Sequence, residues 1–124
     1  MTDLQPLVSY ATVQAWLEGL RQHWGGEPER DDPERFEILE AFCRFVDKNP
    51  DAIVEECVRV RDGERTVSTK GRRRYADLIA QFQSQAAGSR LRRAKWGNTV
   101  RSFLIHNGIL LQAGPQAGVE EPRT

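Results

Sequence analysis

Apolar residues recur at helical spacing in five segments of this chain, and glycine or proline separates most of the segments. Apolar side chains three or four positions apart lie on one face of an α-helix, and that face must be buried against another element. A chain of 124 residues supports one modest core and is too short for a two-domain enzyme. The sequence therefore predicts an all-α fold, a compact bundle of four to five helices.

Caps and helix breakers set the expected helix boundaries. A side-chain oxygen before the first turn accepts hydrogen bonds from free N–H groups, proline suits the first turn, and glycine ends a helix in a left-handed conformation. The expected starts are Ser9 or Thr12, Asp32 with Pro33, Asn49 with Pro50, Lys70, and Ser89. The expected stops are Gly25 with Gly26, Gly88, and Asn107 with Gly108. The third helix is expected to include Cys57 and Val58, and residues 64–69 to form a loop or a short extended piece.

Three regions are expected along the chain: a flexible leader at 1–8, a helical domain at 9–112, and a tail or truncated interdomain linker at 113–124. No apolar run approaches the roughly 20 residues that span a bilayer, and no signal segment opens the chain. We therefore expect a cytoplasmic protein that does not contact a membrane. Cys43 and Cys57 match no metal motif and form no disulfide framework, so both are expected to be buried free thiols.

Charge is segregated along the chain although the formal net charge is zero. Residues 70–101 contain nine Lys or Arg and a single acid, Asp77, whereas residues 27–64 contain thirteen acids and six bases. The basic charge is thus concentrated in one later region. A negatively charged partner for that region is the first functional hypothesis.

The fourth and fifth predicted helices both begin with cations. A helix N-terminus carries partial positive charge and unpaired N–H groups, so cations are disfavoured there and an anion such as phosphate is favoured. A nucleic-acid backbone would supply such anions, and duplex DNA is the expected partner. The predicted phosphate contacts are Lys70, Arg72, Arg73, Arg74, Arg90, Arg92, Arg93 and Lys95.

Two helix faces are expected to point outward. With Val100 facing the core, the opposite side of the fifth helix should carry Ala94, Lys95, Asn98, Arg101 and Ser102. Short and hydrogen-bonding side chains suit a helix in the major groove, so Lys95, Asn98 and Arg101 are the residues expected to reach base edges. The outer side of the fourth helix should carry Arg73, Ala76, Ala80 and Ser84, together with Asp77 paired to Arg73 at i,i+4.

Other interpretations of the basic region remain open. The cations could be a solvated face, or they could pair with the acidic middle segment without any ligand. A helical protein-interaction module, whose basic face binds an acidic partner or a second copy, is the alternative function. An enzyme is a distant third, because no convergent set of polar residues stands out.

The order of several motifs resembles the core-binding domain of tyrosine recombinases and phage-type integrases. The motifs are an aromatic helix at 42–45 before Asn49-Pro50-Asp51, the set Tyr75, Leu78, Ile79 and Phe82, and Val100-Arg101-Ser102-Phe103-Leu104 closing on Asn107-Gly108-Ile109. The resemblance covers residues 9–112 and implies a SAM-like helical bundle that forms half of a clamp on DNA. It also implies a catalytic domain or other protomers as partners in a recombination complex. The catalytic domain of that family is missing from this chain, and neither Tyr10 nor Tyr75 corresponds to its nucleophile.

Other residue types give weak signals. His23 and His106 lie far apart without neighbouring ligands, so each is expected at the surface or as a cap. Trp16, Trp24 and Trp96 are expected in the core or at its margin, and Tyr75 in the core. We expect no metal, no cofactor, no small-molecule substrate and no catalytic residue.

Overall fold

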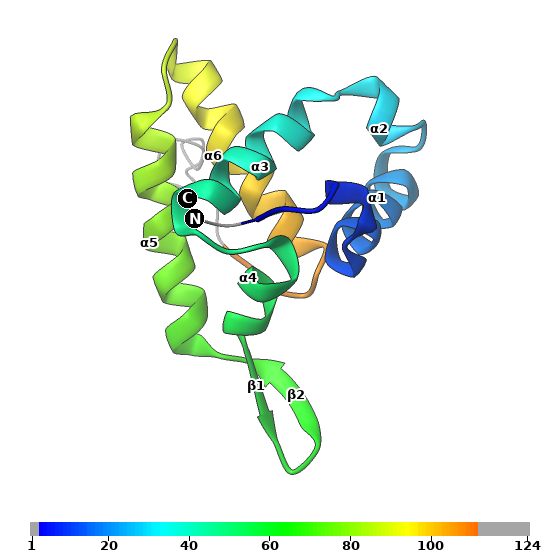
Figure 1. The fold of residues 1–124 in the computed structure, drawn as a ribbon, viewed down its shortest axis with the longest axis vertical. Coiled ribbons are helices and arrows are strands. Elements are labelled where there is room, and N and C mark those ends of the chain that lie inside the picture. The colour runs from blue at the N-terminus through cyan, green and yellow to red at the C-terminus, as the bar shows by residue number, and fades with distance from the viewer. Residues whose placement is uncertain (1–2, 112–124) are drawn as a thin grey trace, which may run out of the picture.

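The computed structural model describes residues 3–111, and helices make up most of it (Figure 1). The elements in chain order are the 3₁₀ turn η1 (Leu7–Ser9), α1 (Ala11–Trp24), α2 (Pro28–Asp31), α3 (Glu34–Val46), α4 (Pro50–Glu56), β1 (Val58–Arg61), β2 (Glu64–Val67), α5 (Thr69–Gln85) and α6 (Arg90–Ile105). The predicted all-α bundle is confirmed. Its five predicted helices correspond to α1, α3, α4, α5 and α6, and α2 is an additional single turn. The predicted tail at 113–124 lies outside the described residues.

Three helices begin with the side-chain cap that stabilises a helix start. Asn49 caps α4 by accepting from the Ala52 amide at 2.8 Å, and Ser89 caps α6 by accepting from the Arg92 amide at 3.2 Å. Both caps confirm the predicted starts. The cap of α5 is Ser68, two residues before the expected start at Lys70.

The expected caps of the first helix (Ser9 or Thr12) and of the second helix (Asp32) are wrong. Thr12 does not cap α1; its hydroxyl instead donates to the Asp51 carboxylate at 2.6 Å, which ties α1 to the start of α4. Ser9 donates its hydroxyl to the Pro6 carbonyl. Asp32 makes no cap bond at the start of α3, because its carboxylate is directed to cations elsewhere in the fold. Contacts between distant segments therefore compete with capping for these short polar side chains.

The core is built from aromatic rings contributed by most of the helices. Trp16 meets Phe103 edge to face at 5.7 Å, and Phe82 stacks against Trp96 at 5.0 Å. Tyr75 is buried, as predicted, and its hydroxyl donates to the Glu56 carboxylate at 2.7 Å. The helix α6 packs against α5, α3 and α1, so several of its sides are covered. Trp24 is the exception to the predicted core, since it is 74% exposed at the end of α1.

Both cysteines are buried and free, as predicted. Burial raises the pKa of the Cys43 thiol to about 12 and that of Cys57 to about 11. Desolvation disfavours the thiolate, so neither residue has the character of a nucleophile. Both cysteines contribute to the core as small apolar side chains.

Residues 58–67 form a β-hairpin that extends away from the helices (Figure 1). The expected third helix ends at Glu56, so the prediction that Val58 belongs to it is wrong. Val58 pairs with Val67 and Arg61 pairs with Glu64 in an antiparallel register. The two-residue turn is Asp62-Gly63, with φ of 54° and 80°, and a turn with two positive φ values matches the twist of paired strands.

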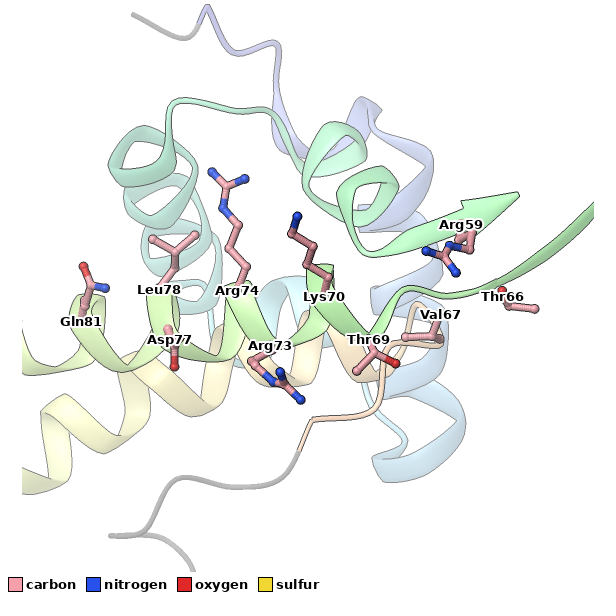
Figure 2. Close-up of a pocket in the computed structure, with 10 residues that line it drawn as sticks. All are labelled: Arg59, Thr66, Val67, Thr69, Lys70, Arg73, Arg74, Asp77, Leu78 and Gln81. Atoms are coloured by element: carbon pink, nitrogen blue, oxygen red, sulfur yellow. The ribbon is translucent and has the colours of Figure 1, made fainter. Parts of the chain in front are cut away.

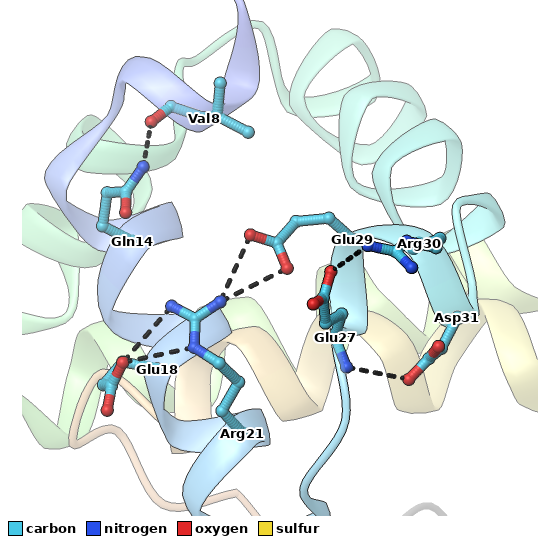
Figure 3. A network of polar contacts seen from close by, with 8 residues as sticks. All are labelled: Val8, Gln14, Glu18, Arg21, Glu27, Glu29, Arg30 and Asp31. Atoms are coloured by element: carbon cyan, nitrogen blue, oxygen red, sulfur yellow. Dashed lines mark hydrogen bonds and ion pairs between the residues drawn. The ribbon is translucent and has the colours of Figure 1, made fainter.

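A polar network fixes the short α2 against α1 (Figure 3). The Arg21 guanidinium donates to Glu18 at 3.2 Å and to Glu29 at 3.2 Å, and Pro28 is buried beneath the turn. This region lies at the opposite end of the molecule from the hairpin (Figure 1). None of the helices in residues 3–111 is long and apolar enough to cross a membrane.

Candidate nucleic-acid interface

An open groove of about 820 Å³ lies where the hairpin joins α5 (Figure 2). It is lined by Arg59, Thr66, Val67, Thr69, Lys70, Arg73, Arg74, Asp77, Leu78 and Gln81. In Figure 2, Lys70 and Arg74 extend to one side of α5, and Arg73 and Asp77 extend to the other. Four cations and one acid therefore surround the groove, which we call the junction groove.

Local contacts hold the hairpin at a fixed place beside α5. The Ser68 amide donates to the Cys57 carbonyl at 2.8 Å, which closes the base of the hairpin. The Ser68 hydroxyl then accepts from the Gly71 amide at 3.0 Å and starts α5 immediately after β2. At Gly71 the helix touches the end of α4 so closely that a Cβ would lie 2.2 Å from the Glu56 carbonyl oxygen. Strand and helix are thus joined with little freedom at the junction groove.

Most cations at this end of the molecule lack an acidic partner. Within residues 3–111, Lys70, Arg72 and Arg73 have no carboxylate within 4.0 Å, and all three are exposed. Arg74 lies 3.9 Å from Glu56, a long and weak ion pair. The expected pair between Arg73 and Asp77 is likewise not formed among the described residues. Positive potential at the start of α5 is therefore largely uncompensated.

The start of α6 differs, because acids at and just before the start of α3 pair with two of its cations. Arg92 pairs with Glu34 at 2.8 Å, and Lys95 pairs with Glu34 at 2.9 Å and with Asp32 at 3.1 Å. The hydrogen bond from Lys95 is the main cause that lowers the pKa of Glu34. For these two cations the internal-pairing alternative is therefore met, because carboxylates offset the conflict with the helix dipole. That Arg92 and Lys95 contact phosphate stays a prediction.

The expected outer face of the fifth helix is also corrected. Arg101 is only 7% exposed, and its Nη1 donates to the Asn98 side-chain oxygen at 2.9 Å. Ser102 accepts from the Trp16 indole N–H at 3.1 Å, on the inner side of the helix. Asn98 is exposed. Because α6 is covered by three other helices, the rest of the expected face is buried or half-buried, and Arg101 does not extend toward solvent.

Arg90 and Arg93 lie in the first turn of α6, next to the loop that joins it to α5. Arg90 is exposed, and Arg93 is half-buried with its Nη1 donating to the Gly88 carbonyl at 2.7 Å. Among residues 3–111 neither has a carboxylate partner within 4.0 Å. Five of the ten predicted contacts are therefore cations without an ion pair in the described part of the chain: Lys70, Arg72, Arg73, Arg90 and Arg93.

The hairpin is the part of the candidate interface that the sequence prediction missed. Arg59 and Thr66 are paired across the strands and both line the junction groove. Arg61 is exposed and has no ion pair in the described part of the chain, while Arg65 pairs with Glu55 at 3.1 Å. The signal was present: an Asp-Gly pair between two short alternating segments is typical of a β-hairpin.

The remaining weak candidates lie apart from the groove. His23 is exposed, and His106 is half-buried at the C-cap of α6, as expected for surface and cap positions. In residues 3–111 no group of three or more His, Cys, Asp or Glu side chains is arranged to hold a metal. No protein-family model matches the chain, and neither a curated protein nor a solved structure matches it.

Proposed function

We propose that this chain is a non-catalytic DNA-binding module that grips duplex DNA mainly through phosphate contacts around the junction groove. The observation that carries the proposal is the set of unpaired, exposed cations at the start of α5, namely Lys70, Arg72 and Arg73. Arg59 and Arg61 of the hairpin add to the same end of the molecule. Arg90 and Arg93 form a second basic group at the other end of α5, where α6 begins (Figure 1).

Phosphate is the anion that suits this arrangement best. The N-terminal turn of α5 adds partial positive charge to the cations, and guanidinium groups match phosphate oxygens in geometry. A protein that neutralises several phosphates releases condensed counterions, which makes binding favourable at low salt. The segregation of charge in the sequence and the resemblance to the core-binding domain of tyrosine recombinases support the same partner. In that resemblance the cleavage chemistry belongs to a separate domain.

The test is fluorescence anisotropy with a labelled duplex over a range of salt concentration. With about five phosphates neutralised, log K should fall against log salt with a slope of about -4.5, or about 500-fold between 50 and 200 mM salt. Changing Lys70→Gln together with Arg73→Gln should reduce the slope to about -2.7. Arg30→Gln removes one cation from the far end of the molecule and serves as the control.

Three outcomes would contradict the proposal. One is no binding at low salt, and another is binding that is indifferent to salt. The third is an equal loss of affinity in the Arg30→Gln control, which would mean that net charge alone attracts DNA.

A protein-interaction module is the second candidate, and one observation favours it. Val60 and Val67 lie on the same face of the hairpin and are 60% and 40% exposed. An exposed apolar face beside cations suits an acidic protein partner with some apolar surface. Light scattering with and without duplex separates the two functions: a salt-sensitive dimer that ignores DNA favours this second candidate.

A further inference from the structure

A second cavity, of about 340 Å³, lies between α5 and α6. Its lining residues are Ala80, Gln83, Ser84, Arg90, Arg93, Ala94 and Arg101. Three of the seven are arginines and none is an acid. This composition is unusual, because cations on a protein surface are ordinarily interspersed with acids.

Arg101 is the most unusual of the three arginines. It is buried, with only 7% of its surface exposed. Among the described residues it nevertheless makes one hydrogen bond, which Nη1 donates to the Asn98 side-chain oxygen. A guanidinium has five N–H donors, so most of them have no protein acceptor in this part of the chain. Desolvation lowers the pKa of Arg101, and within residues 3–111 no carboxylate lies within ion-pair distance to offset it. A buried cation ordinarily has an anionic partner.

Close packing at Gly97 holds two polar side chains beside the cavity. A Cβ at Gly97 would lie 1.9 Å from the Gln83 Oε1 atom and 2.9 Å from the Arg101 Nη1 atom. Gln83 is 8% exposed, and its Oε1 atom has no hydrogen-bond partner in the structure. The absence of a side chain at Gly97 therefore lets Gln83 and Arg101 approach the backbone of α6, where both line the cavity.

The other two arginines approach from the first turn of α6. Arg93 is oriented by its hydrogen bond to the Gly88 carbonyl, which leaves further N–H donors free. Arg90 is exposed at the start of the same helix. Arg92, by contrast, is paired with Glu34 and does not line the cavity.

We propose that this cavity binds a phosphate group, with Arg101 as its buried anchor and Arg90 and Arg93 beside it. A tetrahedral phosphate offers several acceptor oxygens, and guanidinium groups bind such oxygens through paired N–H donors. The bound group is either a phosphate of a nucleic-acid backbone or a free phosphate-bearing small molecule. The proposal does not rest on DNA binding at the junction groove, because the two sites share no lining residue.

The first test uses inorganic phosphate, measured by isothermal titration and by thermal unfolding at constant ionic strength against chloride. Wild type should bind phosphate saturably and gain thermal stability. Arg93→Gln and Arg101→Gln should each weaken binding at least tenfold. Arg30→Gln, which removes an exposed arginine of α2 outside the cavity, should bind like wild type.

Phosphate binding that does not saturate, or an equal loss in Arg30→Gln, overturns the proposal. Arg93 is less buried than Arg101, so Arg93→Gln keeps the test decisive if Arg101→Gln fails to fold.

A second measurement identifies the source of the phosphate. If inorganic phosphate competes with labelled duplex and Arg93→Gln weakens duplex binding, the cavity holds a backbone phosphate. If phosphate binds saturably but neither effect is seen, the site serves a small molecule. The variant Lys70→Gln with Arg73→Gln should lose duplex affinity while it retains phosphate binding, which separates failure of this proposal from failure of the proposed function.

Discussion

Replacing Gly71 with alanine should destabilise the junction between the hairpin and α5, although helix propensity alone predicts a gain in stability. Alanine is ordinarily the better helix former by about 1 kcal/mol. At this position, however, the added Cβ would lie 2.2 Å from the Glu56 carbonyl oxygen and 3.0 Å from the Cys57 Cα. Both atoms belong to the backbone, so the clash cannot be relieved by rotating a side chain.

The expected magnitude follows from these two opposing effects. Forcing an extra methyl into a packed site costs about 1 to 3 kcal/mol, and a backbone contact puts Gly71→Ala at the upper end. Subtracting about 1 kcal/mol for helix propensity leaves a net loss of about 2 kcal/mol in the free energy of unfolding. For a domain of this size that loss lowers the melting temperature by about 8 °C.

Urea denaturation followed by circular dichroism measures the change in the free energy of unfolding. Ala76→Gly is the control, because Ala76 is exposed on α5 and should lose only the propensity contribution of about 1 kcal/mol. If Gly71→Ala proves as stable as wild type or more stable, the close contact between α5 and the end of α4 is not present. The account of how the junction groove is held would then be wrong.

Two further predictions concern the hydrogen bonds that the carboxylates of Glu56 and Glu34 accept. Tyr75→Phe removes the 2.7 Å hydrogen bond to Glu56 and should lower the free energy of unfolding by about 1.5 kcal/mol in urea denaturation, whereas unchanged stability would show that the bond contributes nothing. Glu34, whose pKa is lowered mainly by the hydrogen bond from Lys95, should stabilise the fold above its ordinary pKa of 4.5 and lose that contribution as pH falls through the lower folded value. Glu34→Gln should therefore show a shallower loss of stability on acidification, and an identical pH profile would contradict the prediction.

The helix pattern could be predicted because it depends on neighbouring residues. The caps Asn49 and Ser89 each accept from an amide three positions later, and Gly108 adopts a positive φ of 88° after α6. Such features use sequence separations of a few residues and need no knowledge of the rest of the fold. The hairpin was missed although its Asp62-Gly63 turn is equally local. The prediction places Val58, the first residue of β1, in the preceding helix.

The candidate interface depended far more on tertiary contacts. Lys95 and Asp32 are separated by 63 positions, and only the packing of α3 beside α6 brings them together. The prediction that Arg101 points outward assumes that only one face of α6 packs against the core. The helix is instead covered by three others, so Arg101 is buried although Asn98 on the same expected face is exposed.

The sequence by itself determined that the chain forms a helical bundle and that cations greatly outnumber acids in residues 70–101. Helix formation is encoded in apolar spacing and caps, and charge is a property of composition. Only the tertiary structure decided which cations are neutralised and which are exposed. Ion pairing needs two charged groups within a few ångströms, and that proximity is created by packing between distant segments. Within residues 3–111 it left Lys70, Arg72 and Arg73 without an ion pair and buried Arg101 without an acid beside it. It also neutralised Arg92 and Lys95 at the start of α6.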